Sequence, residues 1–502
     1  MDDNLAKIIS SPDFITRTAE DRRELIDKAL YSWQRQEFWQ QHNILAKHGF
    51  VINTSDGGAG KTLMGGFEAR LQNKPIVLFT MPTPLIAWDS DMPRIGVNIK
   101  LRMTFPTLKG KLVCNHGLLT RTPENDYVAT DALRELFREK PIVIYDEVHY
   151  ARNKDALLNK ALSTVSRTAR ECGCQLIIIS ATPSHNQGDA VSYVKLFALC
   201  SEGEMLGLDR TTRQYLPLAL RPFLEYCRKI DEVKTLAITK TPFTPVTLEA
   251  IIFALLTKVL IPEIYVRVTP ETPPCHKESK YYKLPPGPHA IVKAAETHRS
   301  KTIGAAMNHG GSKIDIFRAD NKYDQVVEPI VAEYGFVVDI LAIDLRDPNA
   351  KSVIILKFHE SMAHTKALLE ATFPGKIAIM DGDTSVEMRN RLSTLYREDS
   401  DVLKIIITSK DVGGMSISLD DRKGNRERYL FKRADRTTVG NVQIDWRTSR
   451  GTSKSQTFII NGLVDGIKLE RDRRDKDSVK EKDLNRYRGP VRTHTTDTIR
   501  LA

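Results

Sequence analysis

The stretch Asn53–Thr62, NTSDGGAGKT, places a cluster of glycines directly before a Lys-Thr pair. It follows the short apolar run 49–52 and precedes residues 63–71, which can form a helix although Gly65 and Gly66 weaken that prediction. A strand, a glycine-rich turn, Lys-Thr and a helix follow one another in phosphate-binding loops. Glycines let backbone N–H groups converge on phosphate oxygens, and a helix N-terminus adds positive potential. The sequence therefore predicts a nucleotide phosphate site here.

Each residue of this loop has a predicted role. The backbone of Gly58, Ala59 and Gly60 would surround the phosphates, and Lys61 would reach the β- and γ-phosphates of ATP. The Thr62 hydroxyl would be a ligand of Mg²⁺. Ser55 stands where the strict pattern has its first glycine. An ordinary glycine turn before a helix is the alternative interpretation.

Length and composition limit the class of protein. The 502 residues suffice for about two to four domains, and the 41% hydrophobic and 27% charged residues are typical of a globular chain. The net charge of +11, from 74 Lys and Arg against 63 Asp and Glu, favours an anionic polymer as partner. No apolar run reaches the roughly 20 residues of a membrane span, and the N-terminus has no secretory signal. We expect an intracellular protein with reduced cysteines and no membrane partner.

Continuous apolar runs after the loop favour strands of parallel sheets that are covered on both faces. They lie at 75–79, 141–145 and 175–179, and again at 352–356, 376–379, 403–407 and 457–460. Between these two sets, 223–237 and 248–260 have helical spacing, and prolines cluster from Pro270 to Pro288. The expected fold class is α/β, with two parallel-sheet domains in tandem and a mostly helical insertion. The expected boundaries are 1–30 for an N-terminal extension, 31–195 and 336–465 for the two domains, 196–335 for the insertion and 466–502 for a charged tail.

Acidic and hydroxyl residues follow two of the predicted strands. Asp146 and Glu147 end the strand at 141–145, where Mg²⁺ needs a carboxylate. Asp146 would hold the metal through water and Glu147 would orient the attacking water. Ser180 and Thr182 follow the next strand, where small hydroxyl residues can sense the γ-phosphate. A surface acidic turn and a plain strand-ending turn are the alternatives.

Two arginines lie late in the chain, in the stretch Gln443–Arg450. Arg447 and Arg450 are three residues apart and would share one helical face. Planar guanidinium groups suit the phosphoryl charge of a transition state, so Arg450, and with it Arg447, are candidate arginine fingers. A solvated helix face is the alternative.

The order of these motifs resembles that of superfamily-2 helicases, and several stretches resemble the Swi/Snf-like translocases and their poxvirus nucleoside-triphosphatase relatives. The stretches are MPTPLIAW at 81–88, DEVHYARN at 146–153, SATPSHN at 180–186 and SKDVGGMSISL at 409–419. The resemblance covers roughly 31–195 and 336–462. It implies two RecA-like domains with ATP between them, and the arginines would come from the second.

The same resemblance implies further roles. Gln34 would read the adenine, and His149 would couple the ATP site to the nucleic-acid side together with Ser180 and Thr182. Gly413 and Gly414 would approach a nucleic-acid phosphate, with Gln443 nearby. Ser416 and Trp446 replace usual glycines, and Lys357-Phe358-His359 matches the motif after the first strand of the second domain only loosely. These departures concern the second domain's part of the site.

The expected activity is nucleic-acid-dependent ATP hydrolysis by a helicase or translocase. Duplex DNA is favoured as partner by the stretch 146–153 and by Trp88, and transcription or repair machinery is a further expected partner. A helicase-like scaffold that binds ATP without multiple turnover is the second hypothesis. A small-molecule kinase is a third, disfavoured by the second domain and the paired arginines.

Overall fold

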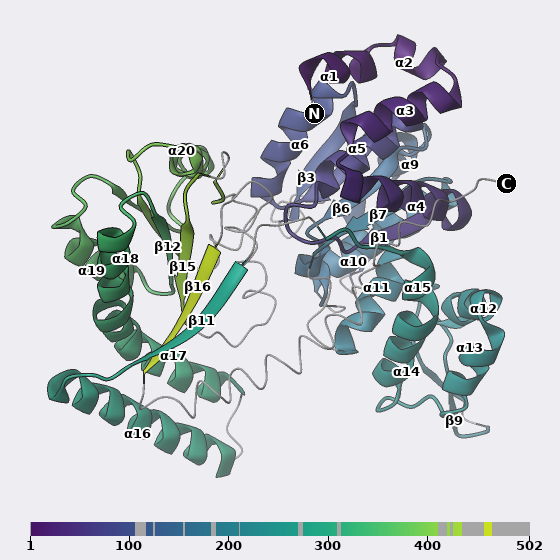
Figure 1. Ribbon diagram of the computed structural model, residues 1–502. Coiled ribbons are helices and arrows are strands. Elements are labelled where there is room, and N and C mark those ends of the chain that lie inside the picture. The colour runs from purple at the N-terminus through teal and green to yellow at the C-terminus, as the bar shows by residue number, and fades with distance from the viewer. Residues whose placement is uncertain are drawn as a thin grey trace. The chain divides into compact units, whose positions relative to one another are not determined.

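The computed structural model divides the chain into two compact units, Met1–Pro270 and Glu271–Val479. It describes residues 2–105, 117–123, 126–153, 156–181, 187–209, 211–269, 275–308, 313–409, 419–421, 425–433 and 456–463. The division falls inside the range 196–335 expected as an insertion, whose described helices are shared between the two units. The predicted domain boundaries stay a prediction. Figure 1 shows the first unit in purple to teal and the second in teal to yellow.

A six-stranded parallel sheet is the centre of the first unit, with strand order β10-β1-β7-β6-β2-β3. The order of the strands in the sheet differs from their order in the chain. Parallel strands need crossover connections, and helices form most of these connections on the faces of the sheet, as Figure 1 shows. The strands are β1 Phe50–Asn53, β2 Ile76–Thr80, β3 Ile99–Thr104, β6 Ile142–Asp146, β7 Gln175–Ile179 and β10 Tyr265–Val266. Four of them, β1, β2, β6 and β7, are almost wholly buried, as their continuous apolar sequences predict.

Helices cover this sheet and extend the unit. Before β1 lie α1 Asp3–Ser10, α2 Asp13–Thr16, α3 Ala19–Ala29 and α4 Ser32–His48. Between the strands lie α5 Lys61–Leu71, α6 Pro82–Arg94, α9 Asp131–Leu136 and α10 Leu157–Glu171. After β7 come α11 Ala190–Leu196, α12 Arg221–Ile230, α13 Glu232–Thr239, α14 Leu248–Leu255 and α15 Ile261–Ile264. Two short hairpins, β4 Leu119–Arg121 with β5 Tyr127–Ala129 and β8 Gly207–Asp209 with β9 Gln214–Leu216, complete it.

The two glycines that weaken the helix prediction after the loop have a packing role. A Cβ on Gly65 would lie 3.0 Å from the Trp88 ring, and one on Gly66 would lie 2.5 Å from the end of Met92. Both contacts belong to α6, so the glycines let α6 approach α5 closely. The helix continues through them because this packing outweighs the cost of glycine.

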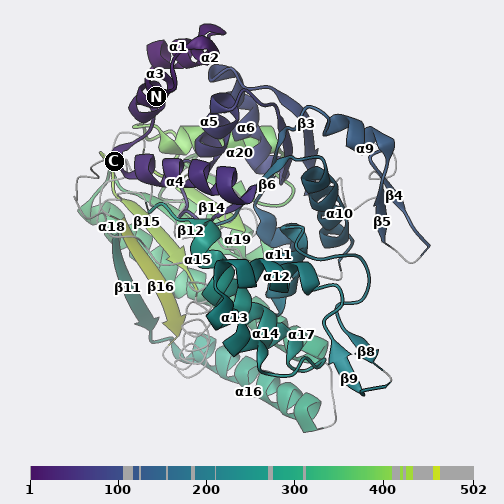
Figure 2. The same ribbon diagram turned by 90° about the vertical axis from the view of Figure 1, so that its right-hand side faces the viewer.

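The second unit is also built on a six-stranded parallel sheet, with strand order β11-β16-β15-β12-β14-β13. Its strands are β11 Cys275–Tyr282, β12 Lys351–Leu356, β13 Ile377–Met380, β14 Ile405–Ser409, β15 Arg428–Lys432 and β16 Gln456–Leu463. Its helices are α16 Pro286–Asn308, α17 Lys313–Val331, α18 Val338–Arg346, α19 His359–Glu370 and α20 Val386–Arg397. The paired strands β11 and β16 lie side by side in Figure 2. The expected fold class, two parallel-sheet α/β domains in tandem, is confirmed.

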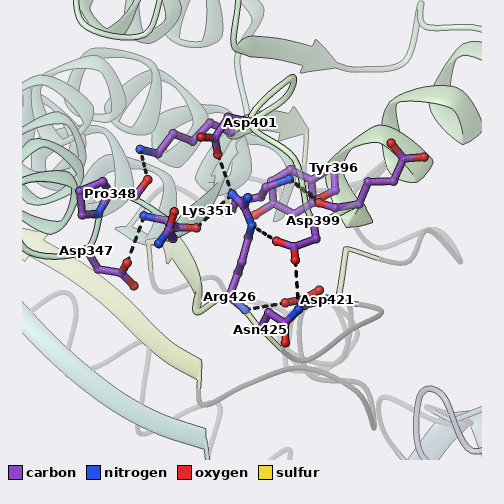
Figure 3. Close-up of polar contacts among 12 residues, drawn as sticks. Asp347, Pro348, Lys351, Tyr396, Asp399, Asp401, Asp421, Asn425 and Arg426 are labelled. Atoms are coloured by element: carbon purple, nitrogen blue, oxygen red, sulfur yellow. Dashed lines mark hydrogen bonds and ion pairs between the residues drawn. The ribbon is translucent and has the colours of Figure 1, made fainter.

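An ionic network that is partly buried lies at the amino ends of β12 and β15 (Figure 3). Arg426 contacts both Asp399 and Asp401 at 2.6 Å, and Figure 3 shows it between these carboxylates. Lys351 is fully buried, and its Nζ donates to the Tyr396 and Glu398 carbonyls, 2.9 Å from each. These carbonyls lie at the end of α20, so Lys351 caps that helix.

No helix among the described residues is both long enough and apolar enough to cross a membrane.

We expect Lys351 to make the stability of the second unit depend on pH. Burial, with Arg428 and Arg426 nearby, lowers the pKa of Lys351 from 10.5 to about 7. Between these values the unfolded chain holds a proton that the folded chain has released, so stability rises with pH, by at most about 1.4 kcal/mol per pH unit. Lys351→Met should remove this slope. Calorimetric unfolding at pH 6.5, 7.5 and 8.5 measures it.

The matched control is Lys322→Met, at an exposed position on α17. It should keep the wild-type slope. An equal slope in wild type and Lys351→Met would show that Lys351 remains charged in the folded chain.

Candidate functional site

The predicted phosphate loop connects β1 to α5, as expected. Gly60 is the N-cap of α5 and has the left-handed conformation with φ +74°, and Gly58 has φ +81°. Residues with a side chain rarely adopt such angles, so glycine is required at these turns. Because the N-cap residue has no side chain, no capping group occupies the N–H groups of the first turn. That helix end is suited to bind an anion.

Gln34 holds the loop from α4. Its Nε2 donates to the Ala59 carbonyl at 2.7 Å, and its Oε1 accepts from the Tyr31 backbone at 2.9 Å. A Cβ on Gly60 would lie 2.4 Å from this same Nε2, so Gln34 also requires a glycine at position 60. The structure therefore places Gln34 against the loop backbone. Its contact with adenine stays a prediction.

Lys61 lies at the first position of α5 and points back over the loop. Its Nζ donates to the carbonyls of Ser55, at 3.0 Å, and Asp56, at 2.9 Å. Phosphate oxygens bind a lysine ammonium more strongly than neutral carbonyls do, because the hydrogen bond is charge-assisted. The loop thus holds the ammonium at the place where the sequence analysis predicts a phosphate. Thr62 follows it in the first turn of α5.

Asp146 is the last residue of β6 and is buried, with 6% of its surface exposed. Its Oδ2 accepts a hydrogen bond of 2.9 Å from the indole N–H of Trp88 on α6, which is itself fully buried. Burial and the neighbouring Glu147 raise the pKa of Asp146 to about 7, and the positive charge of Lys61 acts in the opposite direction. Such a carboxylate, short of compensating positive charge, fits a divalent cation.

Glu147, His149 and Ser180 form a second group beside Asp146. Glu147 has a left-handed backbone with φ 58°, which is strained for this residue type. His149 Nδ1 lies 3.3 Å from Glu147 Oε2 and 3.2 Å from Ser180 Oγ. The Ser180 backbone N–H donates to the Asn53 carbonyl at 3.1 Å, so this group is tied to the end of β1.

The structure thus brings the loop, the acidic pair, His149 and Ser180 to the carboxyl ends of β1, β6 and β7. Parallel strands place these ends at one edge of a sheet, which is where α/β proteins bind ligands. Thr182, Gly413, Gly414, Gln443, Arg447 and Arg450 lie outside the described residues.

Two features of the site were not predicted from the sequence. Trp88 was recognised as part of a motif, but its hydrogen bond to Asp146 has no signature in the pattern. Arg267, whose Nε lies 3.7 Å from Asp56 Oδ1 of the loop, comes from more than two hundred residues downstream. Both contacts join residues that are far apart in the sequence and come together only when the chain folds.

We expect the burial of Asp146 to destabilise the first unit at neutral pH. The pKa of about 7 exceeds that of an ordinary aspartate, so between roughly pH 4 and 7 the folded chain holds a proton that the unfolded chain has lost, and stability falls as pH rises. Asp146→Asn should raise the free energy of unfolding at pH 7.5 by about 1–3 kcal/mol. The gain should vanish near pH 4. Thermal unfolding without nucleotide, with Asp131→Asn on the exposed surface as control, measures it. A loss of stability at pH 7.5 would contradict the prediction.

No family model matches the chain. A protein of Acanthamoeba polyphaga mimivirus, named a "putative ATP-dependent RNA helicase", is 28% identical over 171 residues. These residues are 32% of this chain and 31% of the mimivirus protein, so the match spans about a third of each.

Among solved structures, the SWI2/SNF2 ATPase core of Sulfolobus solfataricus in complex with double-stranded DNA is similar. The similarity covers 91% of this chain and 96% of that one, with 15% identity and a TM-score of 0.29. A TM-score this low supports no conclusion on fold or function. The mimivirus match agrees with the resemblance of the motif order to superfamily-2 helicases, and it covers about a third of this chain.

Proposed function

We propose that the chain is a nucleic-acid-dependent ATPase that moves along duplex DNA. One observation carries the proposal. A lysine and the N-terminus of a helix lie at the same sheet edge as a buried carboxylate of raised pKa, and Lys61 and Asp146 are close enough to interact electrostatically. This pairing of a phosphate-binding group with a metal-binding group suits a nucleoside triphosphate with Mg²⁺.

In this proposal, residues of the first unit bind the nucleotide and the metal ion and position the attacking water. The first turn of α5 and Lys61 hold the phosphate oxygens, and Thr62 and Asp146 are the candidate ligands of Mg²⁺. When bound, Mg²⁺ neutralises charge on the β- and γ-phosphates. The indole N–H of Trp88 fixes the orientation of the Asp146 carboxylate, which would hold the ion or its water. Glu147 orients the attacking water, and His149 Nδ1 lies beside both Glu147 and Ser180.

The second unit contributes the remaining groups of the proposal. The resemblance assigns Arg447 and Arg450 to the phosphoryl charge of the transition state, an effect worth about 10³–10⁵ in rate for arginine fingers. Contacts with DNA would be made to phosphates, and they are therefore expected to be independent of sequence and sensitive to salt. The name of the mimivirus protein gives RNA as an alternative polymer.

Substitutions at two residues separate binding from chemistry. Lys61→Ala should lower ATP turnover at least about 100-fold and weaken nucleotide binding, because the ammonium contacts the phosphates in ground and transition states. Glu147→Gln should lower kcat by roughly 100-fold while binding changes only a few-fold, because orienting the water matters only in the reaction. Steady-state turnover and fluorescent-nucleotide titration measure the two effects. Lys47→Ala, an exposed lysine on α4, is the control. Full activity of Lys61→Ala would reject the site.

The nucleic-acid partner is tested by stimulation of turnover. Duplex DNA should raise kcat more than single-stranded DNA, single-stranded RNA or duplex RNA of equal length. The stimulation should weaken steeply between 50 and 200 mM salt, since counterion release drives phosphate contacts. If RNA stimulated turnover more than DNA did, the partner would be RNA rather than duplex DNA. If no polymer stimulated turnover, the result would contradict the proposed motor. Binding of ATP without steady-state turnover would instead support a scaffold.

A further inference from the structure

The phosphate loop is hydrogen-bonded along one side to the segment Tyr265–Val268. Strand β10 pairs in parallel with β1, with Asn53 opposite Val266. The pairing continues past the end of β1, because the Thr54 N–H donates to the Val266 carbonyl at 2.8 Å and the Asp56 N–H to the Val268 carbonyl at 2.9 Å. The first half of the loop therefore continues the pairing of β1 with β10 rather than forming a separate turn.

Ser55 adds a side-chain bond to this pairing. The residue is fully buried, and its Oγ accepts a hydrogen bond of 2.9 Å from the Val268 N–H. Its carbonyl accepts from Lys61 Nζ at 3.0 Å. Ser55 thus links the lysine of the loop to Val268, a link that the glycine of the strict loop pattern has no side chain to make.

Arg267 and Asp56 make a second link between the same two segments. The Arg267 Nε lies 3.7 Å from Asp56 Oδ1, and only 10% and 12% of the two side chains are exposed. At this burial a charge pair is screened less than on the surface. The Asp56 carbonyl also accepts from Lys61 Nζ, at 2.9 Å. Both carbonyls that hold the ammonium therefore belong to residues fastened to Arg267–Val268.

This segment also lies just before the point where the chain passes from the first unit to the second. The boundary between the units falls at Pro270 and Glu271, two residues after Val268. The residues that brace the loop are thus nearly the last ones before the chain enters the second unit. A displacement of the loop would act on the segment that precedes this boundary in the chain.

We propose that Ser55 and Arg267 are positioning residues that couple occupancy of the phosphate loop to the chain entering the second unit. The inference rests on the proposed function. A phosphate would draw Lys61 Nζ away from the carbonyls of Ser55 and Asp56, because a charged acceptor binds the ammonium more strongly. The two carbonyls lose their donor, and the loop relaxes together with the segment bonded to it. The hydrogen bonding of segment 265–268 then differs between the nucleotide-free and the nucleotide-bound protein.

Hydrogen exchange of the full chain, with and without Mg²⁺ and a non-hydrolysable ATP analogue, tests the coupling. In the wild type the analogue should change exchange in peptides that cover 262–269 several-fold. Ser55→Ala should lose this change, and it should weaken binding of the analogue about 3- to 10-fold, as expected for one lost buried hydrogen bond. Ser55→Thr keeps a hydroxyl and should retain the change, and Arg267→Gln should reduce it.

The outcomes separate the two proposals. If the wild type binds no analogue, or Lys61→Ala binds it as tightly, the proposed function fails. If the wild type binds the analogue but exchange at 262–269 is unchanged, the coupling is wrong. A purely structural role of Ser55 would alter exchange in Ser55→Ala equally with and without the analogue, and that result also overturns the coupling. Should Ser55→Ala not fold, Ser55→Thr and Arg267→Gln carry the same comparison.

Discussion

The N-terminus of α5 is the constraint around which the first unit is arranged. A helix that begins with a glycine N-cap leaves the N–H groups of its first turn without a side-chain acceptor, and the loop places this helix end after β1. Gln34 fixes the loop from one side, and Ser55 fixes it from the other through Val268. The glycines at 65 and 66 let α6 approach, which brings Trp88 to Asp146. Each of these contacts fixes a part of the site relative to that helix end.

The sequence predicts the strands well where both faces of a strand are buried. The run 175–179 is β7 without change, and the runs at 75–79 and 141–145 are shifted by one residue in β2 and β6. Covered parallel strands are continuously apolar, so their pattern is readable from the chain. The helix expected at 223–237 is two helices, because Asp231 ends α12 and caps α13 with its side chain.

The parts that the sequence could not predict depend on distant partners. Strand β10 has only two residues, too few for a periodic signal, yet it braces the loop. The contact of Arg267 with Asp56 and that of Lys351 with the end of α20 join segments far apart in the chain. A local pattern contains no information on such pairs. The glycine and arginine motifs of the second domain stay predictions, since they lie outside the described residues.

Burial of charge alone does not identify a functional site in this chain. Asp146 and Lys351 are both buried and both have a pKa near 7, reached from opposite directions. They differ in their place on the sheets. Lys351 begins β12, and its Nζ donates to the carbonyls that end α20, so these hydrogen bonds account for a lysine at a buried position. Asp146 ends β6, at the edge where the chain also places Lys61, and its pKa stays raised although Trp88 and Lys61 both act to lower it. A cation with a phosphate at this edge would supply what is missing, whereas the amino end of β12 needs no ligand.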